Sequence, residues 1–139
     1  MIFKVRQTSD GGYITSGYTS SNNLDLQILK FSSGGDLEWS HTRSPSNSNA
    51  SEIGHDIQET IDGGYISTGG VNEVIVFKID SSGNYEWENI FNHSTNHAAY
   101  GEAIQQKTNN NYIISGSINF SGNKNILLLE IDSEGNRIF

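Results

Sequence analysis

Apolar residues recur along the chain in short runs that are separated by polar, glycine-rich turns. The three most apolar runs are six residues long: Leu26–Phe31, Val74–Ile79 and Ile126–Ile131. Runs of this length are too short for free-standing helices, and their Val and Ile content favours strands. Because apolar and polar residues barely alternate within them, we expect both faces of these strands to be covered.

A repeated string sets the period of the chain. Asp-Gly-Gly-Tyr-Ile occurs at Asp10–Ile14 and Asp62–Ile66, and a related copy, Asn-Asn-Asn-Tyr-Ile, occurs at Asn109–Ile113. The tyrosines of these strings are 52 and 47 residues apart: Tyr13, Tyr65 and Tyr112. The unit is therefore about 50 residues long, and repeats of this size are typical of stacked or radial arrays. The units span approximately residues 1–46, 47–97 and 98–139.

Aligned on the tyrosines, each unit contains four strand-like segments. The first segments are Val5–Thr8, Ile57–Thr60 and Ile104–Lys107. The second segments, which begin with the tyrosines, are Tyr13–Gly17, Tyr65–Gly69 and Tyr112–Gly116. The third segments are the apolar runs, and the fourth are Leu37–Trp39, Tyr85–Trp87 and Arg137–Phe139. The polar linkers Arg43–Ser51 and Asn92–Ala98 lead from one unit to the next.

The turns between the segments have hairpin chemistry. Glycine pairs after Asp10 and Asp62 supply the positive φ that a tight hairpin needs, and Asn110 and Asn111 replace them in the third unit. A second set of turns precedes the fourth segments: Ser32–Asp36, Asp80–Asn84 and Asp132–Asn136. We interpret them as type I turns closed by a glycine bulge.

These patterns predict an all-β chain built from β-propeller blades. Four antiparallel strands per unit, with middle strands covered on both sides, describe a blade, whereas a sandwich or barrel would leave one wet face per strand. Trp39 and Trp87 are expected to pack on the next blade. Phe139 stands at the position of Trp87, so we expect the third blade to be incomplete and residues 1–139 to form one partial propeller domain.

Composition narrows the class of partner. The formal charge is −8, with only 8 Lys and Arg residues, which argues against nucleic acid as a partner. Cysteine is absent, so disulfides and thiolate metal sites are excluded. No apolar stretch approaches the roughly 18 residues that cross a bilayer. The first residues lack a signal-peptide pattern, so either the protein is intracellular or its leader lies outside this chain, and we favour the second.

At these residues the chain resembles a family of bacterial and archaeal surface β-propeller proteins. The resemblance rests on repeats that read Gln-x-Thr-x-Asp-Gly-Gly-Tyr-Ile, then Ile-Asp-x-x-Gly-Asn-x-x-Trp, and it covers nearly the whole chain apart from the linkers. It implies a location outside the cell or on its surface, and a role in binding or display. It implies no particular ligand.

Three blades cannot close a ring, because propellers have four to eight. We therefore expect either that copies associate to complete a ring, or that the chain is a piece of a longer array. The leading functional hypothesis is a non-enzymatic extracellular module that binds protein or glycan and associates with itself. A structural subunit of an extracellular filament or coat is one alternative, and a propeller enzyme, quinoprotein-like or a lyase, is another.

Few residues suggest chemistry, and no catalytic or cofactor-binding residue is assigned. The segment Ile79–Trp87 resembles the blade signature of quinoprotein alcohol dehydrogenases but is one residue shorter. The Asp-x-x-Gly-Asn turns offer calcium only one or two acidic groups each, where the ion prefers six to eight oxygens. The chain has four histidines: His41, His55, His93 and His97. The last two are spaced i, i+4 but lie in a polar linker, so we interpret them as residues of a solvated loop rather than a metal pair. We thus expect no cofactor, with calcium as the alternative.

Two further sets of residues are candidates for modification or ligand contact. Three asparagines fit the glycosylation sequon and are expected in linkers or loops: Asn49, Asn92 and Asn119. In a propeller the first strand of each unit would line the central channel. That topology places five residues at the channel wall: Lys4, Asp56, Gln58, Ala103 and Gln105. Such a polar wall suits sugars better than lipids, which makes glycan binding a hypothesis.

Overall fold

The chain is built from strands and turns. The computed structural model describes residues 1–20, 24–43, 51–92 and 98–139. In these ranges there is no helix, and eleven strands form three antiparallel sheets of four, four and three strands. The described residues therefore include no helix long and apolar enough to cross a membrane. The prediction of an all-β chain is confirmed.

Each repeat unit forms its own sheet, in which strands that are consecutive in the chain pair with one another. The first sheet contains β1 (Ile2–Gln7), β2 (Tyr13–Ser20), β3 (Leu24–Phe31) and β4 (Leu37–Arg43). The second contains β5 (Gly54–Glu59), β6 (Tyr65–Gly69), β7 (Val74–Ile79) and β8 (Tyr85–Phe91). The third contains β9 (Ala99–Gln106), β10 (Tyr112–Phe120) and β11 (Asn123–Ile131).

The third unit departs from the predicted four strands. Its expected fourth strand, Arg137–Phe139, forms only an isolated bridge between Arg137 and Ile131. Backbone bonds still hold this segment on β11, because Glu130 N donates to the carbonyl of Phe139 and Ile138 N donates to that of Glu130. An incomplete third sheet was expected, and the described residues agree with that expectation.

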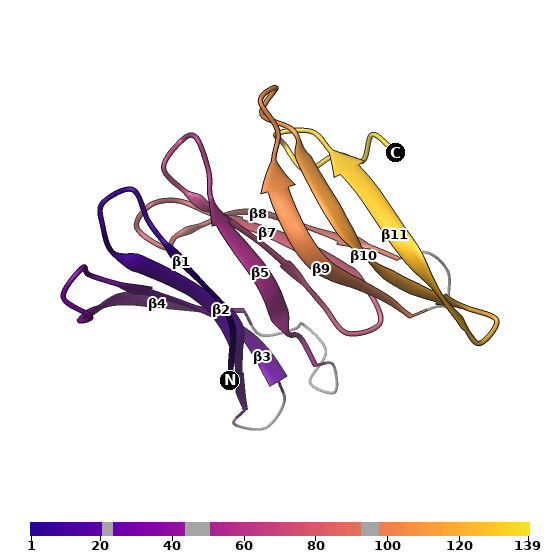
Figure 1. The fold of residues 1–139 in the computed structure, drawn as a ribbon, viewed down its shortest axis with the longest axis horizontal. Helices are drawn as coiled ribbons and strands as arrows, with labels where there is room; N and C mark the ends of the chain where they lie inside the picture. Colours follow the sequence, from indigo (N-terminus) through magenta and orange to yellow (C-terminus); the bar gives the residue numbers. More distant parts are fainter. Residues whose placement is uncertain (21–23, 44–50, 93–97) are drawn as a thin grey trace.

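The three sheets lie one after another, with their faces in contact (Figure 1). The first strands of the units, β1, β5 and β9, are neighbours across the sheets rather than partners in one sheet. One apolar cluster fills the space between the first and second sheets and includes Leu26, Ile28 and Phe77. A second cluster fills the space between the second and third sheets and includes Val74, Val76 and Leu129. The second sheet is thus sandwiched between the other two.

The prediction that every third strand is covered on both faces holds only for β7, all of whose residues are buried. Its residues Ile75 and Phe77 face the first sheet, while Val74 and Val76 face the third. In β3 burial alternates, and most of β11 is exposed, so the prediction is wrong for these two strands. The reason is position, because each lies in an end sheet with a neighbour on one side only.

In the first set of turns the predicted positive φ is confirmed for the first residue of each pair and not for the second. Gly11 and Gly63 have φ of 82° and 81°, and Asn110, at the same place in the third unit, has φ of 67°. Asparagine therefore substitutes for glycine in the left-handed conformation. In the second set of turns, Gly35, Gly83 and Gly135 all have positive φ.

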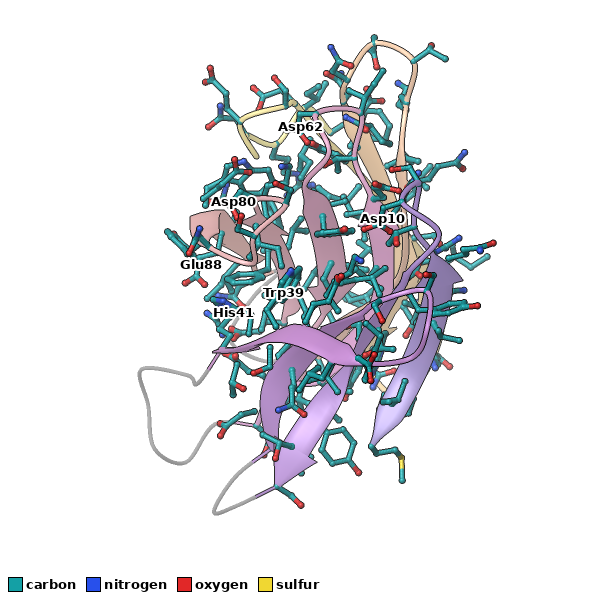
Figure 2. All side chains as sticks on the ribbon, turned by 90° about the vertical axis from the view of Figure 1, so that its left-hand side faces the viewer. Asp10, Trp39, His41, Asp62, Asp80 and Glu88 are labelled. Carbon is teal, nitrogen blue, oxygen red and sulfur yellow. The ribbon has the colours of Figure 1, made fainter. Side chains whose placement is uncertain are left out.

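Neighbouring sheets are joined by a tryptophan that lies on a turn glycine of the next sheet. A β-carbon on Gly83 would lie 2.7 Å from Cε3 of Trp39, and Trp39 also stacks beside Tyr65 with ring centroids 5.8 Å apart. Trp87 repeats this contact one unit later, against Gly135 and Tyr112. Figure 2 shows Trp39 and His41 close together on the side of the first sheet that faces Asp80. The expectation that the tryptophans pack on the next sheet is confirmed.

We expect Gly83→Ala to destabilise the protein more than Gly35→Ala. Both glycines hold the same turn position with positive φ, so each substitution costs about 1–2 kcal/mol of backbone strain. Gly35 has no atom within 4 Å of a built β-carbon, whereas Gly83 lies under Trp39, which adds about 1–3 kcal/mol of overpacking. Urea unfolding of the two variants measures the difference. Equal losses would mean that the tryptophan contact contributes nothing.

Candidate functional site

A concave feature lined by charged side chains lies along the first strands of the three sheets. It is a hollow of about 500 Å³, whose wall includes residues of β1, β5, β9, β10 and β11. Its polar residues are Lys4, Arg6, Asp56, Gln58, Gln105 and Ser115. Its apolar residues include Ile113 and Leu128. We call this feature the inner hollow.

Asp56 is the centre of the inner hollow and ties three strands together. Its carboxylate is only 2% exposed and accepts hydrogen bonds from Arg6 of β1, at 3.1 and 3.3 Å, and from its neighbour's amide, Ile57 N. It also accepts a hydrogen bond from Ile104 N of β9 at 3.0 Å. Lys4 Nζ lies 3.6 Å from the same carboxylate. A buried carboxylate is stable only when it is paired in this way.

Side chains of β5 also satisfy the free edge of β9. An edge strand leaves backbone N–H groups without ladder partners. Ile104 N donates to Asp56, and Gln106 N donates to Oε1 of Gln58 at 2.9 Å. The first strands therefore stay separate strands, joined by side chains rather than by a backbone ladder.

The structure brings together all five residues predicted to line a channel wall, because each of them borders the inner hollow: Lys4, Asp56, Gln58, Ala103 and Gln105. Sequence reasoning missed Arg6, although it lies two residues after Lys4 on the same strand and so on the same side. It also missed Ile113 and Leu128, which come from other strands of the third unit. The strand period alone would have found Arg6.

A second hollow of about 450 Å³ begins one residue earlier on the same strands. It is lined by Phe3, His55, Tyr100, Glu102 and Lys124. Phe3 packs against His55 with ring centroids 5.5 Å apart, in an edge-on arrangement. The contact of Phe3 with His55 and that of Lys4 with Asp56 both lie between β1 and β5, so the second hollow neighbours the inner hollow along this pair of strands. We call this second feature the aromatic rim.

Two buried lysines are the other candidates for chemistry, because perturbed buried amines occur at catalytic sites. Lys30 Nζ lies 2.8 Å from carboxylate oxygens of both Asp10 and Glu38. Burial by itself would lower the pKa of Lys30, but the hydrogen bonds to these carboxylates raise it above its ordinary value. A fully charged, doubly paired amine is neither a nucleophile nor a base. We therefore interpret Lys30 as a structural residue that ties the first turn to β4.

The same arrangement recurs in the other units, with one reversal of charge. Lys78 is paired with Asp62 at 3.0 Å and with Glu86 at 2.6 Å. In the third unit Glu130 takes the lysine's position and accepts a hydrogen bond from Lys107 at 2.6 Å. Recurrence at the same place in every unit is typical of a structural role.

The carboxylates of the Asp-x-x-Gly-Asn turns, considered above as calcium ligands, are used within their own turns. Asp80 accepts from Ser82 N and Asn84 N, and Asp132 is bonded in the same way within its own turn. Hydrogen bonds from the side-chain amides of Asn84 and Asn136, together with these backbone bonds, hold the pKa of both carboxyls below the ordinary value and use the oxygens that an ion would need. Within the described ranges no group of three or more acidic or histidine side chains is placed to hold a metal. His93 and His97 lie outside the described residues.

The predicted glycosylation asparagines are placed unequally. Asn92 is exposed immediately after β8, which agrees with its expected place in a linker. Asn119 is exposed but lies within β10, so its expected place in a loop is wrong. Asn49 lies outside the described residues.

We expect Asp56→Ala to destabilise the protein by about 2–4 kcal/mol, because it leaves Ile104 N unpaired and Arg6 without its partner. Asp36→Ala, which removes an exposed carboxylate from a turn, is the control and should change the unfolding free energy little. Chemical denaturation of both variants tests this. A loss at Asp56 no greater than that at Asp36 would contradict the structural role of this carboxylate.

Acid should weaken the turn that Asp10 stabilises. Hydrogen bonds from Lys30, Thr8 and Gly12 N hold the pKa of Asp10 well below its ordinary 3.8. A carboxyl whose pKa is lower in the folded state contributes stability above about pH 4, and that contribution is lost as pH falls further. The Tm of Asp10→Asn should therefore lie below that of the wild type at pH 7, and the gap should narrow between pH 4 and pH 2. A gap that does not change over this range would contradict the assignment.

No model of a known protein family matches the chain, and the search of curated proteins found no match. The fold and the inner hollow are therefore the basis for a functional proposal.

Proposed function

We propose that this chain is a non-enzymatic β-propeller module, located outside the cell or on its surface, that binds a ligand and associates with copies of itself. The observation that carries the proposal is a contact between neighbouring sheets that forms twice within the chain. The first sheet exposes the surface that receives this contact, and the third sheet exposes apolar residues of the surface that makes it. The occupant proposed for those open faces is a second copy, docked head to tail.

The repeated contact has the same parts each time. His41 Nδ1 lies 2.9 Å from the carbonyl oxygen of Gly83, and Asn89 Nδ2 donates to the carbonyl oxygen of Gly135 at 2.8 Å. Just after the first strand of each unit, Ser9 N donates to the side chain of Glu59, and Ile61 N donates to the side chain of Gln106. In both cases the acceptor lies in the following sheet. Because the same contact forms twice, the back face of one sheet is complementary to the front face of the next.

The front half of this contact is open on the first sheet. Tyr13 is 39% exposed, whereas its counterparts Tyr65 and Tyr112 are 3% and 2% exposed under the tryptophans. The space over Gly35 is empty, whereas Gly83 and Gly135 are covered. The first sheet thus presents a tyrosine and a glycine that no tryptophan covers among the described residues.

The back half is open on the third sheet. Ile126 is 89% exposed and Leu128 is 55% exposed. Their counterparts in the other sheets are fully or almost fully buried: Leu26, Ile28, Val74 and Val76. A contiguous apolar face of this kind favours association. Two copies would bring together twice the three sheets of one chain, a number within the range of propeller rings.

Two positions fit the proposed contact poorly: Phe139 stands where the other units have tryptophan, and Ile2 stands where the other sheets have glycine. Ile2 pairs with Gly17 as Gly54 pairs with Gly69, so it stands where the other sheets have glycine. A β-carbon on Gly54 would lie 2.2 Å from Oγ of Ser16 in the preceding sheet. Ile2 would meet Ser115 of the second copy in this place, so the contact between copies is expected to be weaker than the contacts within the chain.

We expect the wild type to shift from its monomer mass of 15.3 kDa toward a dimer as concentration rises, and Ile126→Lys to remain a monomer. Ile126 is almost fully exposed, so the unfolding free energy should not fall. Ile61→Lys, at an 80% exposed isoleucine in a turn, is the matched control and should associate like the wild type. Sedimentation equilibrium measures all three.

The remaining outcomes separate the alternatives. Ile2→Gly should strengthen association, because it restores the glycine found at this place in the other two sheets. Masses that grow without limit would favour the filament or coat subunit, since a head-to-tail contact that does not close gives a polymer. A wild type that stays monomeric at all concentrations would overturn self-association.

A further inference from the structure

We propose that the inner hollow and the aromatic rim together bind an acidic saccharide, with the sugar carboxylate at Lys4 and Arg6 and a sugar ring over Phe3 and His55. This names a ligand class for the binding role proposed above and rests on that role. It does not depend on association between copies, because these four residues lie on β1 and β5 of one chain.

The charge of the inner hollow selects an anion. Lys4 and Arg6 bring two positive charges to its wall, and Asp56 brings one negative charge, so one positive charge is left over among the charged residues that line it. The protein as a whole carries a formal charge of −8, which makes this excess local and unusual. Asp56 is buried and fixes Arg6 through two hydrogen bonds. Lys4 lies farther from Asp56, at 3.6 Å, and its side chain is 40% exposed.

The neutral polar groups suit hydroxyls. The oxygen of Gln58 is used by Gln106 N, so its amide nitrogen is the part that can donate to a ligand. Gln105 and Ser115 also line the wall and can both donate and accept. A wall that combines one net positive charge with several neutral donors matches a hydroxylated carboxylate better than a bare inorganic anion.

The size and the aromatic rim favour a sugar over a small carboxylate. A hollow of about 500 Å³ lies within the range of ordinary ligand sites, which is roughly 300–1,000 Å³. Phe3 is half exposed and is held edge-on against His55 and beside Tyr18. Exposed aromatic faces next to a few placed polar groups are typical of ligand sites, and the C–H face of a pyranose ring can lie on such a surface.

The test is calorimetric titration of the wild type with trigalacturonate, with maltotriose as an uncharged match of the same length and acetate as a carboxylate without a ring. We expect trigalacturonate to bind and both comparison ligands to bind far more weakly or not at all. Added NaCl should weaken the binding, because the contact with Lys4 is partly exposed to screening. Equal binding of maltotriose, or no binding of trigalacturonate, overturns the proposal.

Variants locate the site. Lys4→Gln should weaken trigalacturonate binding about tenfold, since it removes the positive charge that lies farther from Asp56, at 3.6 Å, and is held there by no hydrogen bond to that carboxylate. Lys107→Gln is the matched control, because Lys107 has the same 40% side-chain exposure but lies just after β9, where it is paired with Glu130. Phe3→Ala should also weaken binding, with no change in net charge. Unchanged binding in both Lys4→Gln and Phe3→Ala overturns the proposal.

The titration is repeated on Ile126→Lys, so that ligand binding and association are read separately. Binding by this variant, if it is a monomer, supports a site within one chain. Failure to bind in both proteins, when the wild type still associates, overturns the saccharide proposal and leaves self-association standing.

Discussion

The structure depends on one constraint: a sheet with two apolar faces must be covered on both. In the second sheet this is achieved, and every residue of β7 is buried. Fully burying an aliphatic side chain of this size contributes about 1.5–3 kcal/mol, so the rows of β7 outweigh any single polar contact in the protein. The end sheets have the same kind of sequence but a neighbour on one side only. Apolar residues on their outer faces therefore remain exposed, with Ile126 and Leu128 of the third sheet as the clearest examples.

The repeat, the strand positions and the turn conformations were predictable from the sequence because they depend on local chemistry. Tyr65–Gly69 and Val74–Ile79 were placed without error, and Asn110 was expected at positive φ. Burial was predictable only for the middle unit. The runs Leu26–Phe31 and Ile126–Ile131 are apolar like β7, and nothing local distinguishes a strand with two neighbours from a strand with one.

The candidate site was predicted in outline, because alternation along a strand tells which residues share a side. It could not be predicted in detail, because its chemistry comes from contacts about 50 residues apart in the sequence. Asp56 is ordinary in the sequence, and only the stacking of three sheets brings Arg6 and Ile104 N to it. A carboxylate that is buried and paired with groups from both neighbouring sheets is positioned by the packing of the whole molecule.

The inner hollow and the open back face share one residue, Leu128, and this links the two proposed activities. Leu128 and Ile113 line the hollow, while Leu128 also belongs to the apolar face of the third sheet. A copy docked on that face would cover the part of the inner hollow that Leu128 lines, while leaving Lys4 and Arg6 of the first sheet uncovered. Linkage is reciprocal, so any change that docking makes in ligand affinity must be matched by an equal effect of the ligand on docking. A ligand that contacts Leu128 would oppose association, whereas one that contacts only the polar residues of β1 and β5 would leave association unchanged.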